Sequence, residues 1–286
     1  MKSDSNVKRL PSKVLVFSVT TVGLLHNSIF VSSTPEILRS LGESENLAGL
    51  LIAAGSVPGI VVAPLIGFLA DRFGRKKVLV PCLVVYGIFG LLVGLSPSLF
   101  WFLLIRIFQG LGSAGLINLV VVIISDNWAS LDRARLIGQN AAAITISVAI
   151  YPVVGGVITD LIGWRWVFLA FLAPLVVAFF VSKNLQDHQP RSDVSVREQI
   201  SGAFSEIVKP AIATNLVIVI ILFMAIFGLF QSLLPVHLER EFGLLPTGRG
   251  LVASAPAVVA ALSALAVARV RKRVQGGVII YASLLI

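Results

Sequence analysis

Long apolar segments alternate with short polar ones along most of the chain. A helix that crosses a bilayer needs about 20 mainly apolar residues, and segments of this kind recur along the sequence. The expected spans are Val14–Ile37, Leu47–Ala70, Val78–Leu95, Phe100–Ile124, Leu136–Ile158, Trp164–Val181, Ala211–Val236 and Gly248–Ala268. A further apolar segment begins near Gly276 and continues to Ile286. The pattern predicts an all-α polytopic membrane protein.

The longest polar segment, Ser182–Pro210, divides the spans into a first six and a shorter remainder. Within it, Ser195 and Glu198 have the spacing of a capping box, and apolar residues then recur at helical spacing. We expect an amphipathic helix on the membrane surface there. The predicted units are a six-helix N-terminal bundle over 1–182, a linker over 183–210 and an incomplete C-terminal bundle over 211–286.

The two sets of spans carry similar sequence patterns. Phe, Ser, Pro and Leu occur at the same spacing from Phe30 to Leu38 and, 200 residues later, from Phe230 to Leu238. Chance is the competing explanation, since Ser and Leu are common in this chain. We interpret the match as parallel repeats, a known transporter plan in which a full second copy would run to roughly residue 400. We expect the chain to end in the third helix of that copy.

Charge is scarce, and its distribution sets the expected orientation. Only 13% of the residues are charged, against about 25% in a soluble domain. Of the 23 Lys and Arg residues, 18 lie in the N-terminus and every second loop after it, four lie in the other loops, and Arg106 lies inside a span. Lys and Arg favour the cytoplasmic side, so we expect a cytoplasmic N-terminus in an inner or plasma membrane. The net charge of +9 then points to anionic membrane lipids and not to nucleic acid.

Residues that support catalysis or metal binding are sparse. Cys82 is the one cysteine, which excludes a disulfide within the chain and a cysteine-based metal site. The three histidines are scattered, and the sequence has no nucleophile–base pair or phosphate-binding loop. We therefore expect no enzyme activity, no metal and no cofactor. Met1–Lys13 is polar and basic without a cleavage site after an apolar core, so we expect no cleaved signal peptide.

The turn between the second and third spans has the most distinctive sequence, Gly67-Phe68-Leu69-Ala70-Asp71-Arg72-Phe73-Gly74-Arg75-Lys76-Lys77. Asp, Lys and Arg each cost roughly 2.5–3.5 kcal/mol at the centre of a membrane helix, so this stretch belongs in an aqueous turn. We expect Gly67 to permit close helix packing and Gly74 to permit a tight turn. The bases alone would also suit an ordinary loop that faces the cytoplasm.

The spacing in this turn resembles Gly-x-Leu-Ala-Asp-Arg-x-Gly-Arg-Lys, the signature of the major facilitator superfamily between helices 2 and 3. Every specified position is present from Gly67 to Lys76. The resemblance implies the fold of that superfamily, transport by alternating access, a gating role for this loop, and an ion pair between Arg75 and Asp126 at the inner end of the fourth span. The corresponding turn of the second copy, Arg269–Arg273, has no Asp or Gly, and we interpret it as an anionic-lipid anchor.

The fourth span carries a second pattern, because Arg106, Gln109 and Gly110 resemble the Arg-x-x-Gln-Gly pattern of the same superfamily. These residues share one helical face. Arg106 is the one charge clearly inside a span, and an intramembrane charge indicates function by default. The competing interpretation is that its side chain reaches the outer membrane surface, because it lies about 9 Å into its helix at 1.5 Å per residue.

The fifth span contains Tyr151-Pro152-Val153-Val154-Gly155-Gly156, which resembles the antiporter signature Gly-Pro-x-x-Gly-Gly of the drug-efflux branch. Pro152 removes a backbone donor and should kink the helix, and Gly155 and Gly156 permit close helix contact. Tyr151 replaces the first glycine of the signature. We expect this tyrosine to widen the helix interface or to fill a cavity, so the assignment as an antiporter stays open at this point.

Secondary transport usually needs a titratable group, yet no Asp or Glu lies deep in any span. His26 is the central candidate because imidazole titrates near neutral pH, and Glu36 lies at the outer end of the same span. In the superfamily, helices 1, 4, 7 and 10 line the central cavity, so the resemblance places His26 and Arg106 on one cavity. The alternative is that His26 and Asn27 only hydrogen-bond helices together.

These features predict a monomeric, proton-coupled efflux transporter of small hydrophobic or amphipathic compounds. The cargo class follows from the aliphatic and Phe-rich cavity helices, in which Asn215 and Gln231 are among the few polar groups. Two alternatives remain. One is an importer of a small metabolite from the same superfamily, and the other is a truncated fragment that transports nothing.

Overall fold

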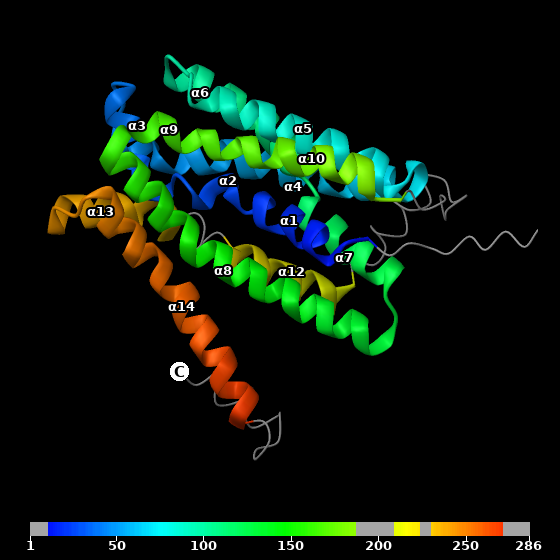
Figure 1. Ribbon diagram of the computed structural model, residues 1–286. Helices are drawn as coiled ribbons and strands as arrows, with labels where there is room; N and C mark the ends of the chain where they lie inside the picture. Colours follow the sequence, from blue (N-terminus) through cyan, green and yellow to red (C-terminus); the bar gives the residue numbers. More distant parts are fainter. Residues whose placement is uncertain (1–10, 187–208, 224–229, 271–286) are drawn as a thin grey trace, which may run out of the picture.

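The structure is a computed structural model that describes residues 11–186, 209–223 and 230–270. Within these ranges every regular element is a helix (Figure 1). Segments long and apolar enough to cross a membrane are Glu45–Phe73, Arg75–Val93, Leu99–Asn127, Ser130–Ile162 and Trp164–Asn184, and the bent pair Lys13–Gly23 and Leu25–Ser40 forms one more. These segments coincide with the first six predicted spans, so the all-α polytopic fold class is confirmed.

The first span is divided into four short helices. They are α1 (Lys13–Gly23), α2 (Leu25–Ser28), the 3-10 turn η1 (Val31–Ser33) and α3 (Thr34–Ser40). The two parts of the span meet at an angle of 41°. Pro35 lies in the first turn of α3, where its missing N–H costs no hydrogen bond. The sequence pattern did not reveal this break, which exposes backbone carbonyl groups in the middle of the bundle.

The remaining spans are closer to the predicted continuous helices. Their elements are η2 (Glu45–Leu47), α4 (Ala48–Phe73), α5 (Arg75–Val93), α6 (Leu99–Ser113), α7 (Leu116–Asn127), α8 (Ser130–Ile162), α9 (Trp164–Val167), η3 (Phe168–Phe171), α10 (Leu172–Asn184), α12 (Pro210–Phe223), α13 (Gln231–Phe242) and α14 (Pro246–Val270). The predicted Ala211–Val236 span falls on α12 and α13, with residues 224–229 between them outside the described ranges. The predicted amphipathic helix after Ser195, the residues after Val270 and the apolar segment from Gly276 also lie outside them.

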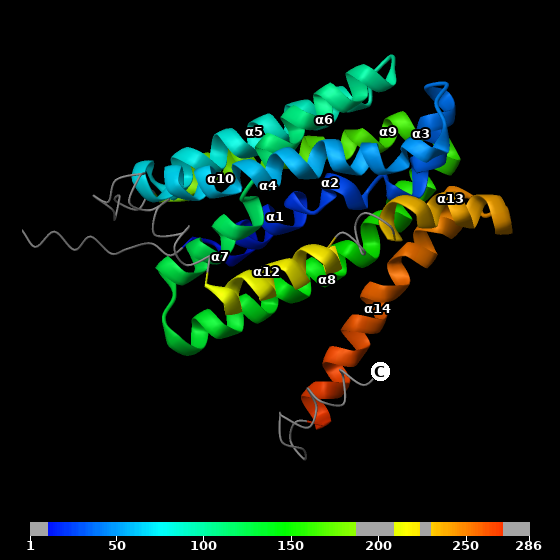
Figure 2. The same cartoon turned by 180° about the vertical axis from the view of Figure 1, so that it is seen from behind.

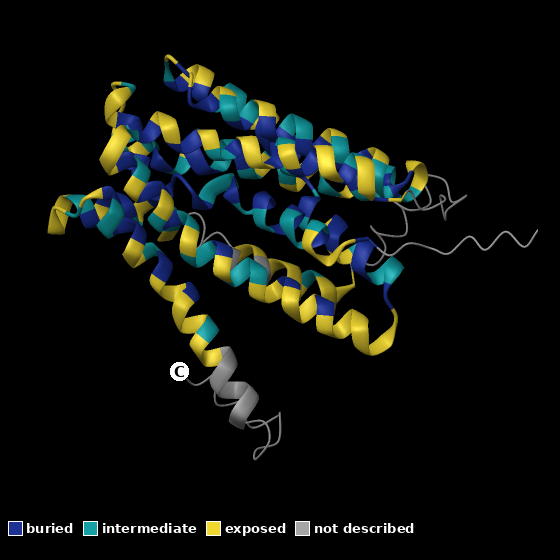
Figure 3. Cartoon of the chain, viewed as in Figure 1, coloured by how far each residue is buried: buried dark blue, intermediate teal, exposed yellow. Residues whose placement is uncertain are grey.

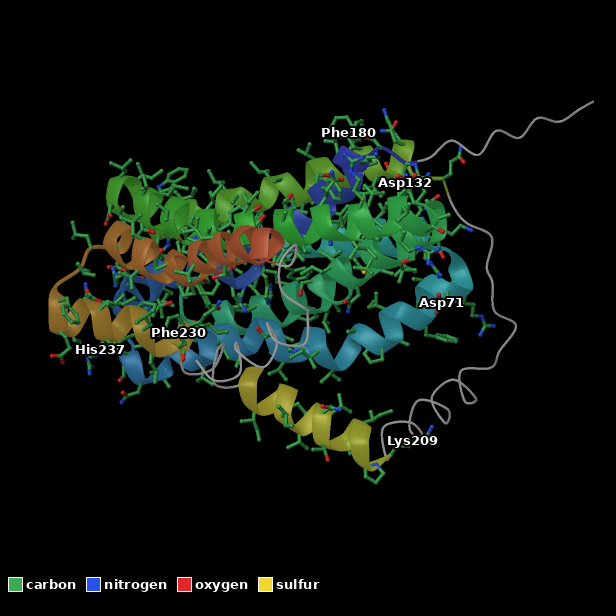
Figure 4. The ribbon with its side chains drawn as sticks, turned by 90° about the horizontal axis from the view of Figure 1, so that it is seen from below. Asp71, Asp132, Phe180, Lys209, Phe230 and His237 are labelled. Carbon is green, nitrogen blue, oxygen red and sulfur yellow. The ribbon has the colours of Figure 1, made fainter. Side chains whose placement is uncertain are left out.

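The bundle has two distinct ends. The basic end carries the α4–α5 turn with Arg72, Arg75, Lys76 and Lys77, whereas the far end carries the α3 and α13 termini. Figure 4 places Asp71, Asp132 and Phe180 toward the basic end and His237 at the far end. Figures 1 and 2 show α14 beginning beside α8 at the far end and leaving the bundle toward its own C-terminus. The two elements that contact each other at the far end therefore diverge toward the basic end.

Buried residues concentrate between α1 and α10, and exposed residues cover the outward faces (Figure 3). Phe30, Phe102 and Phe168 stack edge to face and ring to ring in this core, with centroid separations of 5.8–6.4 Å. Large apolar side chains such as Val61 and Phe100 are exposed on the outside. An apolar outer surface over a packed interior is expected for helices that face lipid.

Candidate functional site

Arg106 is held in the interior of the first six spans. Its side chain has no exposed surface. Its Nη1 donates hydrogen bonds to the His26 carbonyl oxygen at 2.9 Å and to Gln109 Oε1 at 2.7 Å, and its Nη2 donates to Asn27 Oδ1. The guanidinium carbon lies 4.8 Å from the centroid of the Phe30 ring, a cation–π contact. The alternative that Arg106 reaches the membrane surface is therefore wrong, because acceptors around the break in span 1 hold it inside.

No carboxylate pairs with Arg106 among the residues that the structure describes. Removing a cation from water costs several kcal/mol unless other groups compensate. Carbonyl and amide oxygens, together with the face of Phe30, provide that compensation here. Within the described ranges the guanidinium thus has no counterion, so it interacts strongly with any further charge brought near it.

His26 lies directly beside this guanidinium. An ideal Cβ built on Gly55 of α4 would lie 2.6 Å from both His26 Nε2 and Arg106 Nη2, so the two side chains meet over this glycine. Both ring nitrogens of His26 are buried and have no hydrogen-bond partner among the described residues. The sequence did not single out Gly55. The GSVPG stretch that contains it offered a signal, since small residues permit close approach inside membrane helices.

Asn27 and Gly110 connect the site to α4. Asn27 Nδ2 donates to Ser56 Oγ at 2.8 Å while its Oδ1 accepts from Arg106. A Cβ on Gly110 would lie 2.1 Å from the Gly55 carbonyl oxygen, so α6 and α4 approach closely because Gly110 has no side chain. The helix-bridging alternative therefore fits Asn27, whereas the His26 ring makes no such bridge among the described residues.

Two tyrosines bind carbonyl groups next to the break in span 1. The Tyr151 hydroxyl on α8 donates to the Thr21 carbonyl oxygen at 2.9 Å. The Tyr86 hydroxyl on α5 donates to the Val22 carbonyl oxygen at 3.1 Å. Tyr151 thus packs, partly buried, against the core and adds a hydrogen bond to span 1, while the expectation that it widens the interface or fills a cavity stays a prediction. Tyr86 was missed, although a hydroxyl in an otherwise apolar span was a visible signal.

The adjacent residues of α8 contact two different helices. A Cβ on Gly155 would lie 1.5 Å from the Ile29 carbonyl oxygen of span 1, and a Cβ on Gly156 would lie 2.4 Å from the Pro246 carbonyl oxygen of α14. The Pro152 carbonyl oxygen accepts a hydrogen bond from Ser32 Oγ at 2.9 Å. The close contacts expected at the two glycines are therefore present, and α8 continues as one helix through Pro152.

The turn at the basic end contains the ion pair that the family resemblance implied. Arg75 Nη1 lies 2.5 Å from Asp71 Oδ1, and Arg75 Nε lies 3.3 Å from Asp126 Oδ2 at the end of α7. Gly74 has φ of 105° between α4 and α5, a conformation that L side chains rarely adopt. The close packing expected at Gly67 is not observed, because a Cβ there would meet no described atom within 4 Å. That face of α4 has no described helix against it.

A group of ion pairs joins the first six spans to α13 and α14 at the far end. Arg249 of α14 has a fully buried side chain, whose Nη2 pairs with Glu36 Oε1 and whose Nη1 lies 3.1 Å from Glu239 Oε2. Arg39 Nη2 lies 2.5 Å from Glu239 Oε1. Glu36, predicted as a candidate proton carrier, is therefore an ion-pair partner in this conformation. Arg249 was not among the predicted site residues, although a base between two glycines at the start of an apolar span was a signal.

The larger described cavity lies elsewhere, at the basic end between α1 and α10. Its volume is about 700 Å³, and its lining includes Ser12, Ser18, Phe180 and Lys183. A second cavity of about 230 Å³ lies at the far end against Arg165 and Trp166. Neither reaches His26 or Arg106. The predicted placement of these two residues side by side is observed, and the shared cavity stays a prediction.

Two curated proteins are similar to this chain in sequence. Multidrug resistance protein 2 of Bacillus subtilis (strain 168) is 24% identical over 254 residues, which cover 86% of this chain and 63% of the relative. The bacillibactin exporter of the same organism is 30% identical over 160 residues, covering 54% of this chain and 39% of the relative. The chain therefore spans less than two thirds of the length of either relative.

Solved structures share the arrangement of helices. A bacterial homologue of the human lysosomal transporter Spinster, in an inward-facing and occupied conformation, has a TM-score of 0.70 at 20% identity and covers 92% of this chain and 61% of its own. A D-xylose–proton symporter has a TM-score of 0.65 at 20% identity, with 91% and 69% covered. Residues 15–286 match the family model described as Major Facilitator Superfamily. The chain belongs to this superfamily, whose members are transporters and not enzymes.

Proposed function

We propose that this chain forms part of a proton-coupled efflux transporter that moves small hydrophobic or amphipathic compounds by alternating access. The observation that carries the proposal is the proximity of His26 to the buried Arg106, which pairs with no carboxylate among the described residues. The similarity to a multidrug resistance protein and to an exporter supports efflux. Since the chain spans only part of these relatives, the activity of the whole protein is part of the proposal.

The basic end is the cytoplasmic end in this proposal, because Lys and Arg concentrate there. The far end is held together by the Arg249 ion pairs and by the α8–α14 contact, while α14 diverges from α8 toward the basic end. This geometry supports a conformation closed to the outside and open to the cytoplasm. A rocking motion of one helical unit against the other would exchange the closed end.

The proton is carried by His26 in this mechanism. A neutral imidazole beside Arg106 is tolerated, whereas an imidazolium would repel the guanidinium at close range in a medium of low dielectric. Protonation therefore favours a conformation in which the two groups separate or in which Arg106 changes its acceptors. Because Arg106 binds the His26 carbonyl oxygen and Asn27 at the break in span 1, such a change is transmitted to the bend of that span.

The test is transport by the purified full chain in lipid vesicles with an imposed pH gradient. The probe is a fluorescent lipophilic cation, and the gradient is applied in both directions. We expect counter-movement of dye and protons, and we expect His26→Gln to remove the dependence on the gradient, with Glu36→Gln as the second candidate. Movement of a substrate in the same direction as protons would favour the importer, and the absence of any gradient-driven movement would favour a fragment that transports nothing.

A further inference from the structure

The buried charge at the far end is shared between two separate parts of the chain. Glu36 belongs to α3 in the first six spans, and Arg249 and Glu239 belong to α14 and α13. Arg249 is enclosed completely, yet its two terminal nitrogens each reach a different carboxylate. Its Nε and Glu36 Oε2 are buried without a described hydrogen-bond partner. The ion pair is therefore the principal polar compensation for the burial of this guanidinium.

The neighbouring ion pairs differ in exposure. The Arg240 side chain is 63% exposed and lies 2.6 Å from Glu45, and the Arg39 side chain is 62% exposed where it meets Glu239. Exposed pairs contribute little because water and salt screen them. A buried pair is different, since removing one partner leaves an uncompensated charge in the interior. Among the described ion pairs that cross between the two parts, the pair between Arg249 and Glu36 is the one with a fully buried partner.

Backbone contacts fix the position of Arg249. Its neighbour Gly250 lies against the Pro152 carbonyl oxygen, which a Cβ would approach to 2.3 Å. The Thr247 backbone N–H donates to Asp160 Oδ2 of α8 at 2.9 Å. The first turn of α14 is therefore seated directly on α8, and the guanidinium enters the gap between α3 and α13 from this anchored position.

We propose that Arg249 is the central cation of a latch that closes the far end. The latch separates at the bond between Arg249 and Glu36, because Arg249 and Glu239 move together on the connected helices α13 and α14. The role assigned here rests on the proposed alternating-access function, in which the far end must open once in each cycle. The latch closes the far end and is separate from the His26–Arg106 site.

The test measures opening of the far end directly in the full chain. Leu95 and Leu245 are exposed residues at this end, one in each part. Both are replaced by cysteine and spin-labelled. The distance between the two labels is then measured by pulsed electron paramagnetic resonance in lipid nanodiscs. The native Cys82 is buried, and the unsubstituted chain gives the labelling background. We expect Arg249→Gln to increase the population with a long separation on the order of tenfold relative to the double-cysteine parent.

The matched control is Arg240→Gln, which removes an exposed ion pair at the same end and should leave the distance distribution unchanged. Glu36→Gln keeps Arg249 beside Glu239 and should still open the far end, so it provides the same test if Arg249→Gln does not fold. Equal distributions in the parent, Glu36→Gln and Arg249→Gln would overturn the latch. The spin-label distances and vesicle transport are measured independently. Unchanged distances with intact proton-coupled transport would overturn the latch alone, whereas absence of gradient-driven transport would overturn the proposed function.

Discussion

Arg39 of α3 and Glu239 of α13 are 200 positions apart in the sequence, and their side chains form an ion pair of 2.5 Å at the far end. The same interval of 200 residues separates Phe30 from Phe230. Equivalent residues can meet only where an axis relating the repeats passes between them. Parallel transporter repeats are related by an axis along the membrane normal. The duplication itself stays a prediction, and the meeting of Arg39 with a residue 200 positions later is what such an axis would produce.

The position of this pair predicts unequal effects of its two partners on stability. Arg39→Gln should lower the free energy of unfolding by less than about 1 kcal/mol, because the pair is exposed on the Arg39 side. Glu239→Gln should cost more, since Glu239 also compensates the buried Arg249. Thermal unfolding of the two variants in detergent measures the difference. Equal shifts in the midpoint would contradict the assignment of Arg249 as the more important partner.

The sequence was sufficient for the features that depend on local order. Apolar segment length predicted the first six spans, and the motif around Arg75 led to its pairing with Asp126 through the family resemblance. Helical spacing placed Arg106 and Gln109 on one face. Each of these inferences uses residues within one helix or a motif whose partner the family specifies.

Contacts between distant helices leave no pattern in the sequence that would identify the partners. Glu36 and Arg249 are 213 positions apart, and no periodicity indicates that they meet. The break in span 1 depends on acceptors and donors supplied by other spans, such as Tyr86, and on the approach of Gly155 to Ile29. Hydrophobic patterning reports which residues avoid water, but it does not report which helix lies opposite.

Replacing Arg106 by lysine should abolish transport and destabilise the first six spans. Lysine keeps a charge but lacks the planar fork that reaches Asn27, Gln109 and the His26 carbonyl oxygen together. Each buried acceptor that loses its donor costs about 1–3 kcal/mol. Thermal unfolding and vesicle transport of Arg106→Lys measure both effects. The control is Arg165→Lys, because Arg165 is exposed and stacks on Trp164; similar losses in both variants would refute a specific role for the fork.

Tyr151→Phe tests the hydrogen bond that the tyrosine adds to the glycine-containing signature. Loss of the hydroxyl removes the donor to the Thr21 carbonyl oxygen, with an expected cost of about 0.5–1.5 kcal/mol. Tyr151→Gly restores the residue of the resembled signature but removes a large side chain, and we expect a loss of about 3–5 kcal/mol from the cavity left behind. Unfolding measurements that found Tyr151→Gly more stable than the parent would show that the tyrosine is not part of the packing of span 1.

Asp126→Asn tests the ion pair at the basic end. Asp126 and Arg75 each have a side chain that is 12% exposed, so the charge is only partly screened, and we expect a loss of about 1.5–3 kcal/mol. Asp132→Asn is the control, because Asp132 lies in the exposed first turn of α8 and should cost about 1 kcal/mol or less. If the two substitutions shifted the unfolding midpoint equally, the Arg75 pair would not be a specific stabilising contact.

Gly155→Ala should be the most disruptive of the small substitutions. The added Cβ would fall 1.5 Å from the Ile29 carbonyl oxygen, and a backbone atom cannot move aside as the end of a flexible side chain can. Span 1 must therefore separate from α8, which also breaks the hydrogen bond from Tyr151 to Thr21. Gly138→Ala lies in the same helix with no described atom within 4 Å of its Cβ, so it should be neutral or stabilise by about 0.5–1 kcal/mol through helix propensity. Expression, monodispersity and thermal unfolding are measured for both variants. A Gly155→Ala protein as stable as Gly138→Ala would show that the contact between α8 and the break in span 1 is looser than the structure indicates.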